Sequence, residues 1–262
     1  MGSWASAQEP APLEVRWAET QAVAWSGIPS SESAGTTASF LYPASNAGGL
    51  IASVLTHSLL VSGSREIERK ARQTVADQVL EPYKTVIDRL DASQLTGALQ
   101  AHWATEPPNP GSMRRVVHLQ PHFRVSSDHR VIVLDARIRV QEAEDRMAAD
   151  RIVQVVSTPR EGEDPLAAWL DNDAQYFREE IVTMLIHGID IALNVASQPA
   201  IAAPARTQRY AYGNETRMER GQPLAAGCGR IVLWTLRESW MSVPVNPSGP
   251  ATCVNRYQLS PP

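Results

Sequence analysis

Three polar residues in the middle of the chain, His118, Asp135 and Arg137, carry side chains that acid–base catalysis uses. Imidazole and carboxylate groups can exchange protons near neutral pH when burial and neighbouring charges tune their pKa values. The segments that carry them flank the polar tetrad Ser126-Ser127-Asp128-His129, which predicts a hairpin. A cofactor-independent hydrolase with its site assembled around these three residues is one interpretation. It requires a deep pocket, and a flat face on which the groups pair would remove it.

The motifs of cofactor and nucleophile chemistry are absent from the sequence. Neither GxGxxG nor GxxxxGK[ST] occurs, and the GxSxG nucleophile turn is missing. His118 and His122 lie on a predicted strand, where four residues span about 13 Å, so they cannot ligate one metal ion. His187 and Asp190 share one side of a predicted helix and are typical of a solvated face. We therefore expect no cofactor and no metal.

The C-terminal segment has the composition of an interaction surface. It mixes aromatic side chains with arginine, a combination enriched at binding hot spots, in Arg230, Trp234, Arg237, Trp240 and Tyr257. The alternative is that the tryptophans form the core of a β-rich module. The net charge of −4 argues against nucleic acid, so a protein or an envelope component is the expected partner.

Cys228 and Cys253 are the two cysteines of the chain, and neither belongs to a CxxC motif. A disulfide between them would close a loop of about 25 residues and stabilise the fold by roughly 3 kcal/mol. Such a bond would place the protein in an oxidising compartment. Two unrelated thiols are the alternative.

The spacing of apolar residues predicts the strands that would position these side chains. Alternation in Leu13, Val15 and Trp17 predicts a strand, and short strands are expected over 21–25 and 38–42. In the hairpin, pairing Val125 with Arg130 would set Leu119 against Ala136, Phe123 against Ile132 and His118 against Arg137. A third strand over 151–158 is apolar on both sides and should be central. Four more strands are expected over 207–212, 217–224, 230–236 and 240–245.

Helices are expected in two regions. The first holds a buried helix over 46–61, a helix whose line Ile67, Ala71, Val75 and Val79 should be buried, and a stripe of Leu95, Leu99 and Trp103. The second is a long helix over 164–196. Asp164 caps it before Pro165, and it is expected to bend near Asp171-Asn172-Asp173.

These elements predict an α+β fold, a mixed or antiparallel sheet packed by the N-terminal helical segment and one long central helix, with a β-rich C-terminal part. The expected divisions are a flexible tether over 1–12, a core domain over 13–197 and a β-rich module or sheet extension over 205–262.

Compartment is inferred from the N-terminus and the cysteines. Ala5-Ser6-Ala7 before Gln8 resembles the small-x-small pattern of a signal-peptidase site. We expect a non-enzymatic, periplasmic or outer-membrane-associated accessory lipoprotein whose signal and lipid anchor lie upstream of this sequence. It would bind a protein or an envelope component. A subunit of a larger envelope assembly is a further alternative, and the sequence leaves the oligomeric state open.

Overall fold

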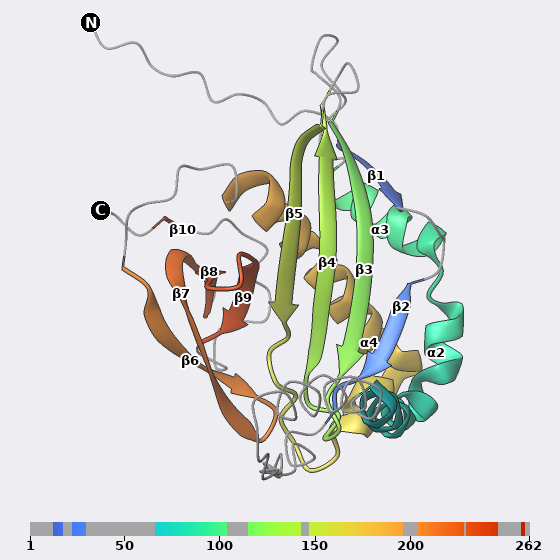
Figure 1. Ribbon diagram of the computed structural model, residues 1–262. Helices are drawn as coiled ribbons and strands as arrows, with labels where there is room; N and C mark the ends of the chain where they lie inside the picture. The colour runs from blue at the N-terminus through green and yellow to red at the C-terminus, as the bar shows by residue number, and fades with distance from the viewer. Residues whose placement is uncertain are drawn as a thin grey trace, which may run out of the picture.

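The computed structural model describes the chain over eight ranges of residues (Figure 1). They are 13–17, 23–29, 66–103, 115–142, 147–195, 204–227, 229–245 and 258–259. Over these ranges the chain is a mixed α+β protein, which confirms the coarse fold class predicted from the sequence. The N-terminal tether, the strand at 38–42, the helix at 46–61, Tyr257 and both cysteines lie outside the described residues.

One mixed sheet organises the described strands. Its order is β1-β3-β4-β5-β9-β8-β7-β10, with β2 also paired to β3 and β6 paired to β7. β1 and β2 run parallel to β3, and β5 runs parallel to β9. The strands are β1 Leu13–Trp17, β2 Ala24–Gly27, β3 Arg115–Val125, β4 Ile132–Gln141, β5 Met147–Val156, β6 Arg206–Tyr212, β7 Glu215–Gly227, β8 Arg230–Thr235, β9 Trp240–Pro244 and β10 Gln258–Leu259.

The β3–β4 hairpin forms where the sequence predicts it, but its register differs by two residues. Val125 pairs with Ile132 instead of Arg130, and Leu119 pairs with Ile138 instead of Ala136. The connection is longer because Ser126 closes it. Its amide donates to the Val131 carbonyl, and its Oγ accepts from the Val131 amide, both at 2.9 Å. A two-residue shift keeps every side chain on its predicted face.

The shift also re-pairs the other predicted partners of the hairpin. Phe123 lies opposite Leu134 instead of Ile132, and His118 lies opposite Arg139 instead of Arg137. Phe123 and Leu134 both remain in the core, and His118 remains on the polar face. The predicted faces are therefore correct and the predicted pairs are wrong.

The C-terminal strands continue the main sheet. β5 lies between β4 and β9, which confirms its predicted central position. The join between β5 and β9 consists of three register pairs, from Val153–Trp240 to Val155–Ser242. A second apolar cluster lies on the sheet face opposite the main core, where Tyr210 and Tyr212 of β6 pack with Val133 and Val156.

The central helix covers one face of the sheet. Helix α4, Pro165–Asp190, contacts β4 and β5 and lies behind them in Figure 1, followed by the π-helical turn η4, Ile191–Val195. As predicted, the Asp164 carboxylate caps it by accepting from the Ala167 amide at 2.9 Å. Burying the large apolar side chains between helix and sheet contributes roughly 1.5–3 kcal/mol each. These include Leu119, Phe123, Leu134, Ile138, Phe177 and Ile181.

Helix α4 is broken at the predicted place. Asn172, Asp173 and Ala174 are left-handed, with φ between 50° and 55°. The bend therefore consists of three non-glycine residues in a conformation that costs about 1–2 kcal/mol per residue. Asp173 is tied to Arg178 at 3.2 Å and to Arg89 of α2, Lys84–Arg89, at 3.5 Å.

The N-terminal helical region runs along the edge of the sheet. Helical residues 66–77 lead into the 3-10 helix η2, Gln78–Tyr83, then into α2 and α3, Ala92–Trp103. Leu95 and Leu99 are buried as predicted, and the Trp17 indole of β1 donates to Thr96 Oγ1 at 2.6 Å. No helix among the described residues is long and apolar enough to cross a membrane.

The expected burial of the line Ile67, Ala71, Val75 is wrong. All three residues are exposed, Ile67 by 71% and Val75 by 65%. Helical periodicity predicts which side chains share a face, but it does not say which face meets the protein. Here the polar side, with Gln73 and Asp77, contacts β2.

Candidate functional site

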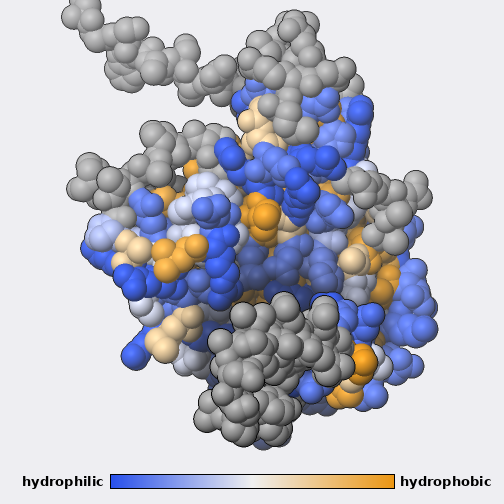
Figure 2. Space-filling view, in the orientation of Figure 1, coloured by the Kyte–Doolittle hydropathy of each residue, from blue (hydrophilic) through white to orange (hydrophobic). Residues whose placement is uncertain are grey.

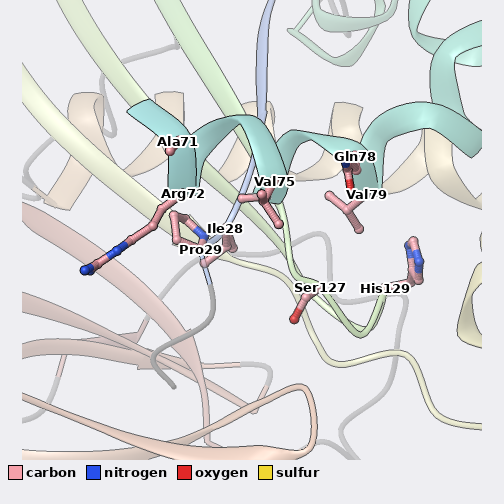
Figure 3. A pocket seen from close by; sticks show the side chains of 10 residues that line it. Ile28, Pro29, Ala71, Arg72, Val75, Gln78, Val79, Ser127 and His129 are labelled. Atoms are coloured by element: carbon pink, nitrogen blue, oxygen red, sulfur yellow. The ribbon is translucent and has the colours of Figure 1, made fainter. Parts of the chain in front are cut away.

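A groove with a volume of about 540 Å³ lies between the 66–79 helical segment, the end of β2 and the β3–β4 turn (Figure 3). Most of its lining is apolar. In Figure 3, Val75 and Val79 point down from the helix toward the β2 end, and Ser127 and His129 lie on the turn below. The lining residues are Ile28, Pro29, Ala71, Arg72, Val75, Ala76, Gln78, Val79, Ser127 and His129.

The helical wall is fixed to β2 through Gly27. The Gly27 amide donates to Asp77 Oδ1 at 2.8 Å, and Gln73 Nε2 donates to both the Gly27 carbonyl, at 2.9 Å, and Asp77 Oδ1, at 2.7 Å. The helix comes so close that a Cβ on Gly27 would lie 1.8 Å from the Ala76 carbonyl oxygen. Residue 27 must therefore be glycine for this wall to stand where it does.

In the part of the chain that the structure describes, Ile67, Ala71 and Val75 of this helix are exposed, whereas Val79, at the same spacing, is half-buried against the core. Gln73 and Asp77 are a turn apart and face β2, whereas Val75 is about 200° around the axis from each of them. Val75 therefore faces outward, in line with Ala71 and Ile67. The helix lies at the lower right of Figure 1, and Figure 2 shows hydrophobic surface at that position.

The opposite wall of the groove is a turn held by Asp128. Its Oδ1 accepts from Ser126 Oγ at 2.5 Å and from the Arg130 amide at 3.1 Å. Its Oδ2 accepts from the Asn214 amide, in the β6–β7 turn, at 3.1 Å. These hydrogen bonds lower the pKa of Asp128 against the opposing effect of its burial. The carboxylate is therefore charged at neutral pH and joins two turns of the molecule.

His129 closes one end of the groove. It is left-handed, with φ of 58°, and its carbonyl accepts from the Trp169 indole at 2.7 Å. Its Nδ1 lies 3.3 Å from the Tyr83 hydroxyl. Burial lowers the pKa of His129, and burial raises the pKa of Tyr83 with a contribution from Asp164. At neutral pH the phenol therefore keeps its proton and can donate it to an uncharged imidazole.

The groove combines an apolar lining with polar groups whose partners lie within the protein. No carboxylate belongs to the lining residues, and His129 is tied to Tyr83 and Trp169 by its ring and its backbone. Apolar walls with polar groups at the ends are the usual composition of a binding site. Among the described residues, no three His, Cys, Asp or Glu side chains lie together as metal ligands would.

The structure does not bring His118, Asp135 and Arg137 together. His118 Nε2 lies 2.9 Å from Gln141 Oε1, and Arg137 forms a two-pronged ion pair with Asp150. Asp135 accepts from Gln154 at 2.6 Å and lies 2.6 Å from Arg124 Nε, which is not directed at it for a hydrogen bond. Each of the three side chains thus has its own partner on the hydrophilic sheet face that Figure 2 shows.

The described members of the predicted C-terminal binding set lie on β8, on β9 and in the turn between them, and none of them belongs to the groove lining. The Trp234 and Trp240 rings are 4.7 Å apart, partly buried, and packed against the main core. Arg230 donates to the Val156 carbonyl and to Ser242 across the β5–β9 join, whereas Arg237 is exposed in the β8–β9 turn. Tyr257, Cys228 and Cys253 lie outside the described residues.

His187 does not lie on a solvated face. It is partly buried, and burial together with the positive charge of Arg230 lowers its pKa to about 4. Burial also raises the pKa of Glu180, two turns earlier on α4, against the opposing charges of Arg230 and Arg160. Both groups belong to α4, and neither is part of the groove lining.

Sequence reasoning missed the groove because three distant segments form it. One signal was present in the sequence. Ser127 and His129 belong to the polar tetrad between two strong strand patterns, and such connections often carry function. The outward-facing line had no such signal, since its pattern is that of an ordinary buried helix.

No family model, no curated protein and no solved structure matches this chain.

Proposed function

We propose that the protein is a non-catalytic accessory protein of the cell envelope that binds a partner protein through the groove. The observation that carries the proposal is the exposure of Ile67 and Val75 on the 66–79 segment, because removing their apolar surface from water on binding lowers the free energy. Covering a valine or isoleucine completely contributes roughly 1.5–3 kcal/mol.

The envelope assignment rests on the sequence. Its supports are the small-x-small pattern at Ala5-Ser6-Ala7 and the two C-terminal cysteines, which are spaced for a disulfide. Fractionation of cells that express the native open reading frame tests it. The protein is expected in the periplasmic or membrane fraction, with Cys228 and Cys253 resistant to thiol reagents until reduced. Recovery with cytoplasmic markers and two free thiols would refute the assignment.

The non-catalytic assignment rests on how the polar side chains are used. The candidates His118, Asp135 and Arg137 pair separately, and the groove lining contains no carboxylate to partner His129. Turnover of any substrate that is abolished by His129→Ala or His118→Ala, with the fold intact, would refute it.

The groove is tested by photocrosslinking in cells. A photoreactive amino acid at position 75 is expected to give a discrete adduct with one partner, and the same amino acid at Leu236 is expected to give none. Leu236 is the matched control because it is equally exposed, at 65%, on the β8–β9 turn. The adduct should disappear when Ile67→Glu is added. Equal adducts from positions 75 and 236 would refute the groove as the binding surface.

A further inference from the structure

β2 is a short strand that connects the helical wall of the groove to the main sheet. It pairs with β3 over four residues, ending at the pair Gly27–Val125, and Figure 1 shows it at the edge of the sheet. On its other side, the main chain of Gly27 holds the helical wall through Asp77 and Gln73. Release of β2 from β3 would therefore also release the wall.

The packing of β2 contains an unsatisfied polar group. The Trp25 ring stacks on Phe123 and Phe177, with ring centroids 4.8 and 5.6 Å away. Its indole N–H is buried and has no hydrogen-bond partner in the part of the chain that the structure describes. A buried donor without an acceptor costs free energy that it would recover in water. Opening of β2 is therefore less costly than the aromatic packing alone would indicate.

A hydrogen bond to a titratable side chain also fastens β2 to β3. Ser26 Oγ lies 2.9 Å from His122 Nε2. Burial lowers the pKa of His122, and the nearby charge of Arg124 acts in the same direction. Asp135 and Asp77 oppose this effect without cancelling it. The imidazole is therefore uncharged at neutral pH and can accept from the Ser26 hydroxyl.

The charged groups that face His122 already have other partners. Asp135, opposite His122 on β4, accepts from Gln154 at 2.6 Å and lies 2.6 Å from Arg124 Nε. Asp77, on the helical wall, accepts from two donors. β2 itself has no charged side chain. A proton on the ring would therefore add a positive charge beside Arg124, and the two carboxylates could balance it only by weakening bonds they already make.

Opening of β2 would relieve this constraint, because it would expose the His122 ring to water. In water, histidine has its ordinary pKa of about 6.5. The open form therefore binds a proton more readily than the closed form. The resulting preference for the closed form is complete above about pH 6.5 and is lost as the pH falls toward the lower pKa of the closed form.

From these observations we propose that β2 and the helical wall form one acid-sensitive unit, which opens locally when His122 gains a proton and closes when it loses it. Local opening of this kind leaves the rest of a fold in place. Since the wall carries Ile67 and Val75, opening would dismantle the groove while β3, β4 and β5 stay paired. The inference goes beyond the proposed function, because it holds whatever the groove binds.

The test is hydrogen exchange of the full chain, followed by mass spectrometry at pH 7.5 and at pH 5.0, both above the ordinary carboxylate pKa of about 4. After correction for the intrinsic effect of pH on exchange, protection over 23–29 and 66–79 is expected to fall severalfold at pH 5.0. The ceiling is about 30-fold, which applies if the closed form stays unprotonated and the open form has a pKa of 6.5. Protection of β4 should not fall.

His122→Gln is the decisive variant, because glutamine can still bond to Ser26 but does not titrate. It should abolish the fall in protection, and His122→Thr is a second non-titrating variant if melting curves show that the first misfolds. His129→Gln and His187→Gln are the matched controls. Burial lowers the pKa of both of these histidines, but neither takes part in the bond to Ser26. Both controls should retain the fall.

Each of four results would overturn the proposal. A fall that persists in the His122 variants would mean that another group titrates, and a fall that either control abolishes would place the sensor at that histidine instead. A fall of equal size in β4 would mean that the whole sheet opens together. Unchanged protection over 23–29 and 66–79 at pH 5.0 would mean that β2 does not respond to acid.

Discussion

At Gly27 the main chain of β2 lies close against the main chain of the groove wall. A side chain there would collide with the Ala76 carbonyl, which belongs to the helix backbone and cannot rotate away. The hydrogen bonds from Gln73 and to Asp77 depend on the same close approach. One residue without a Cβ therefore determines where the helical wall lies.

We predict that Gly27→Ala lowers the free energy of unfolding by about 2–3 kcal/mol, because the wall must shift to accept the methyl group. Urea denaturation measures it. Gly97→Ala is the matched control, since a Cβ there meets nothing within 4 Å in the exposed middle of α3. That control should gain about 0.5–1 kcal/mol from helix propensity. Equal effects at both positions would contradict the collision.

A second prediction concerns His187 and pH. Its pKa is about 4 in the folded state and near 6.5 in an unfolded chain, so the unfolded state binds the proton more readily. The resulting stability is complete above pH 6.5 and is lost as the pH falls toward 4, by up to about 3 kcal/mol. Burial lowers the pKa of His122 and His129 in the same direction.

The measurement is the free energy of unfolding between pH 7 and 4 for the native chain and His187→Gln. The variant should show a distinctly shallower decline, because the remaining histidines and the carboxylates titrate in both proteins. Parallel curves would mean that His187 is not the partly buried, uncharged group that the structure indicates.

At the scale of elements, the break in α4 is the most strained feature. Asparagine and aspartate, the residue types at positions 172 and 173, tolerate the left-handed region, whereas a β-branched side chain does not. The broken helix lets Trp169 reach the His129 carbonyl while Phe177 stacks on Tyr83, with ring centroids 5.1 Å apart. The break therefore supports the end wall of the groove.

We predict that Asn172→Val destabilises the fold by about 1–2 kcal/mol, and that Asn172→Gly stays within a few tenths of the native value. Both variants lose the contact between the Asn172 amide and Gln175, so their difference isolates the backbone. Thermal unfolding checks it. If valine and glycine behaved alike, residue 172 would not be left-handed.

The elements also show how far the sequence could predict the fold. A two-residue period fixed the faces of the β3–β4 hairpin, but the register depended on Ser126 bonding across the turn to Val131. The predicted bend and cap of α4 rest on local residues and are confirmed. The orientation of the 66–79 segment depends on Gln73 meeting Gly27, 46 residues earlier, which no local pattern reveals.

The candidate site was hidden for the same reason. Its lining comes from β2, the helical wall and the β3–β4 turn, and its most telling property is the exposure of Val75. Composition instead drew attention to Trp234 and Trp240, which pack against the core. Aromatic content predicts buried area well, but it does not say whether the protein itself or a partner covers that area.

At the scale of the whole molecule, the predicted boundary between a core domain and a C-terminal part falls inside a continuous sheet. β9 pairs with β5, Arg230 bonds to the Val156 carbonyl, and Tyr210 and Tyr212 cover Val133 and Val156. Removing the C-terminal strands would expose an apolar cluster and part of the edge of β5.

We therefore predict that a chain ending at residue 203 is not independently stable. It should aggregate, or unfold at a clearly lower urea concentration than the full chain. For the full chain, circular dichroism and tryptophan fluorescence should follow one transition. A stable truncated protein, or two separate transitions in the full chain, would establish two independent domains.

The join between β5 and β9 bears on how the protein would respond to force. Its three register pairs are few beside the long ladder of β3, β4 and β5, and the strands meet there side by side in parallel. If the two ends of the chain were pulled apart, the β5–β9 join would be the part of the sheet that separates first. Separation there would uncover Val133 and Val156 of the long ladder, so pulling would expose the same apolar surface that the truncation exposes.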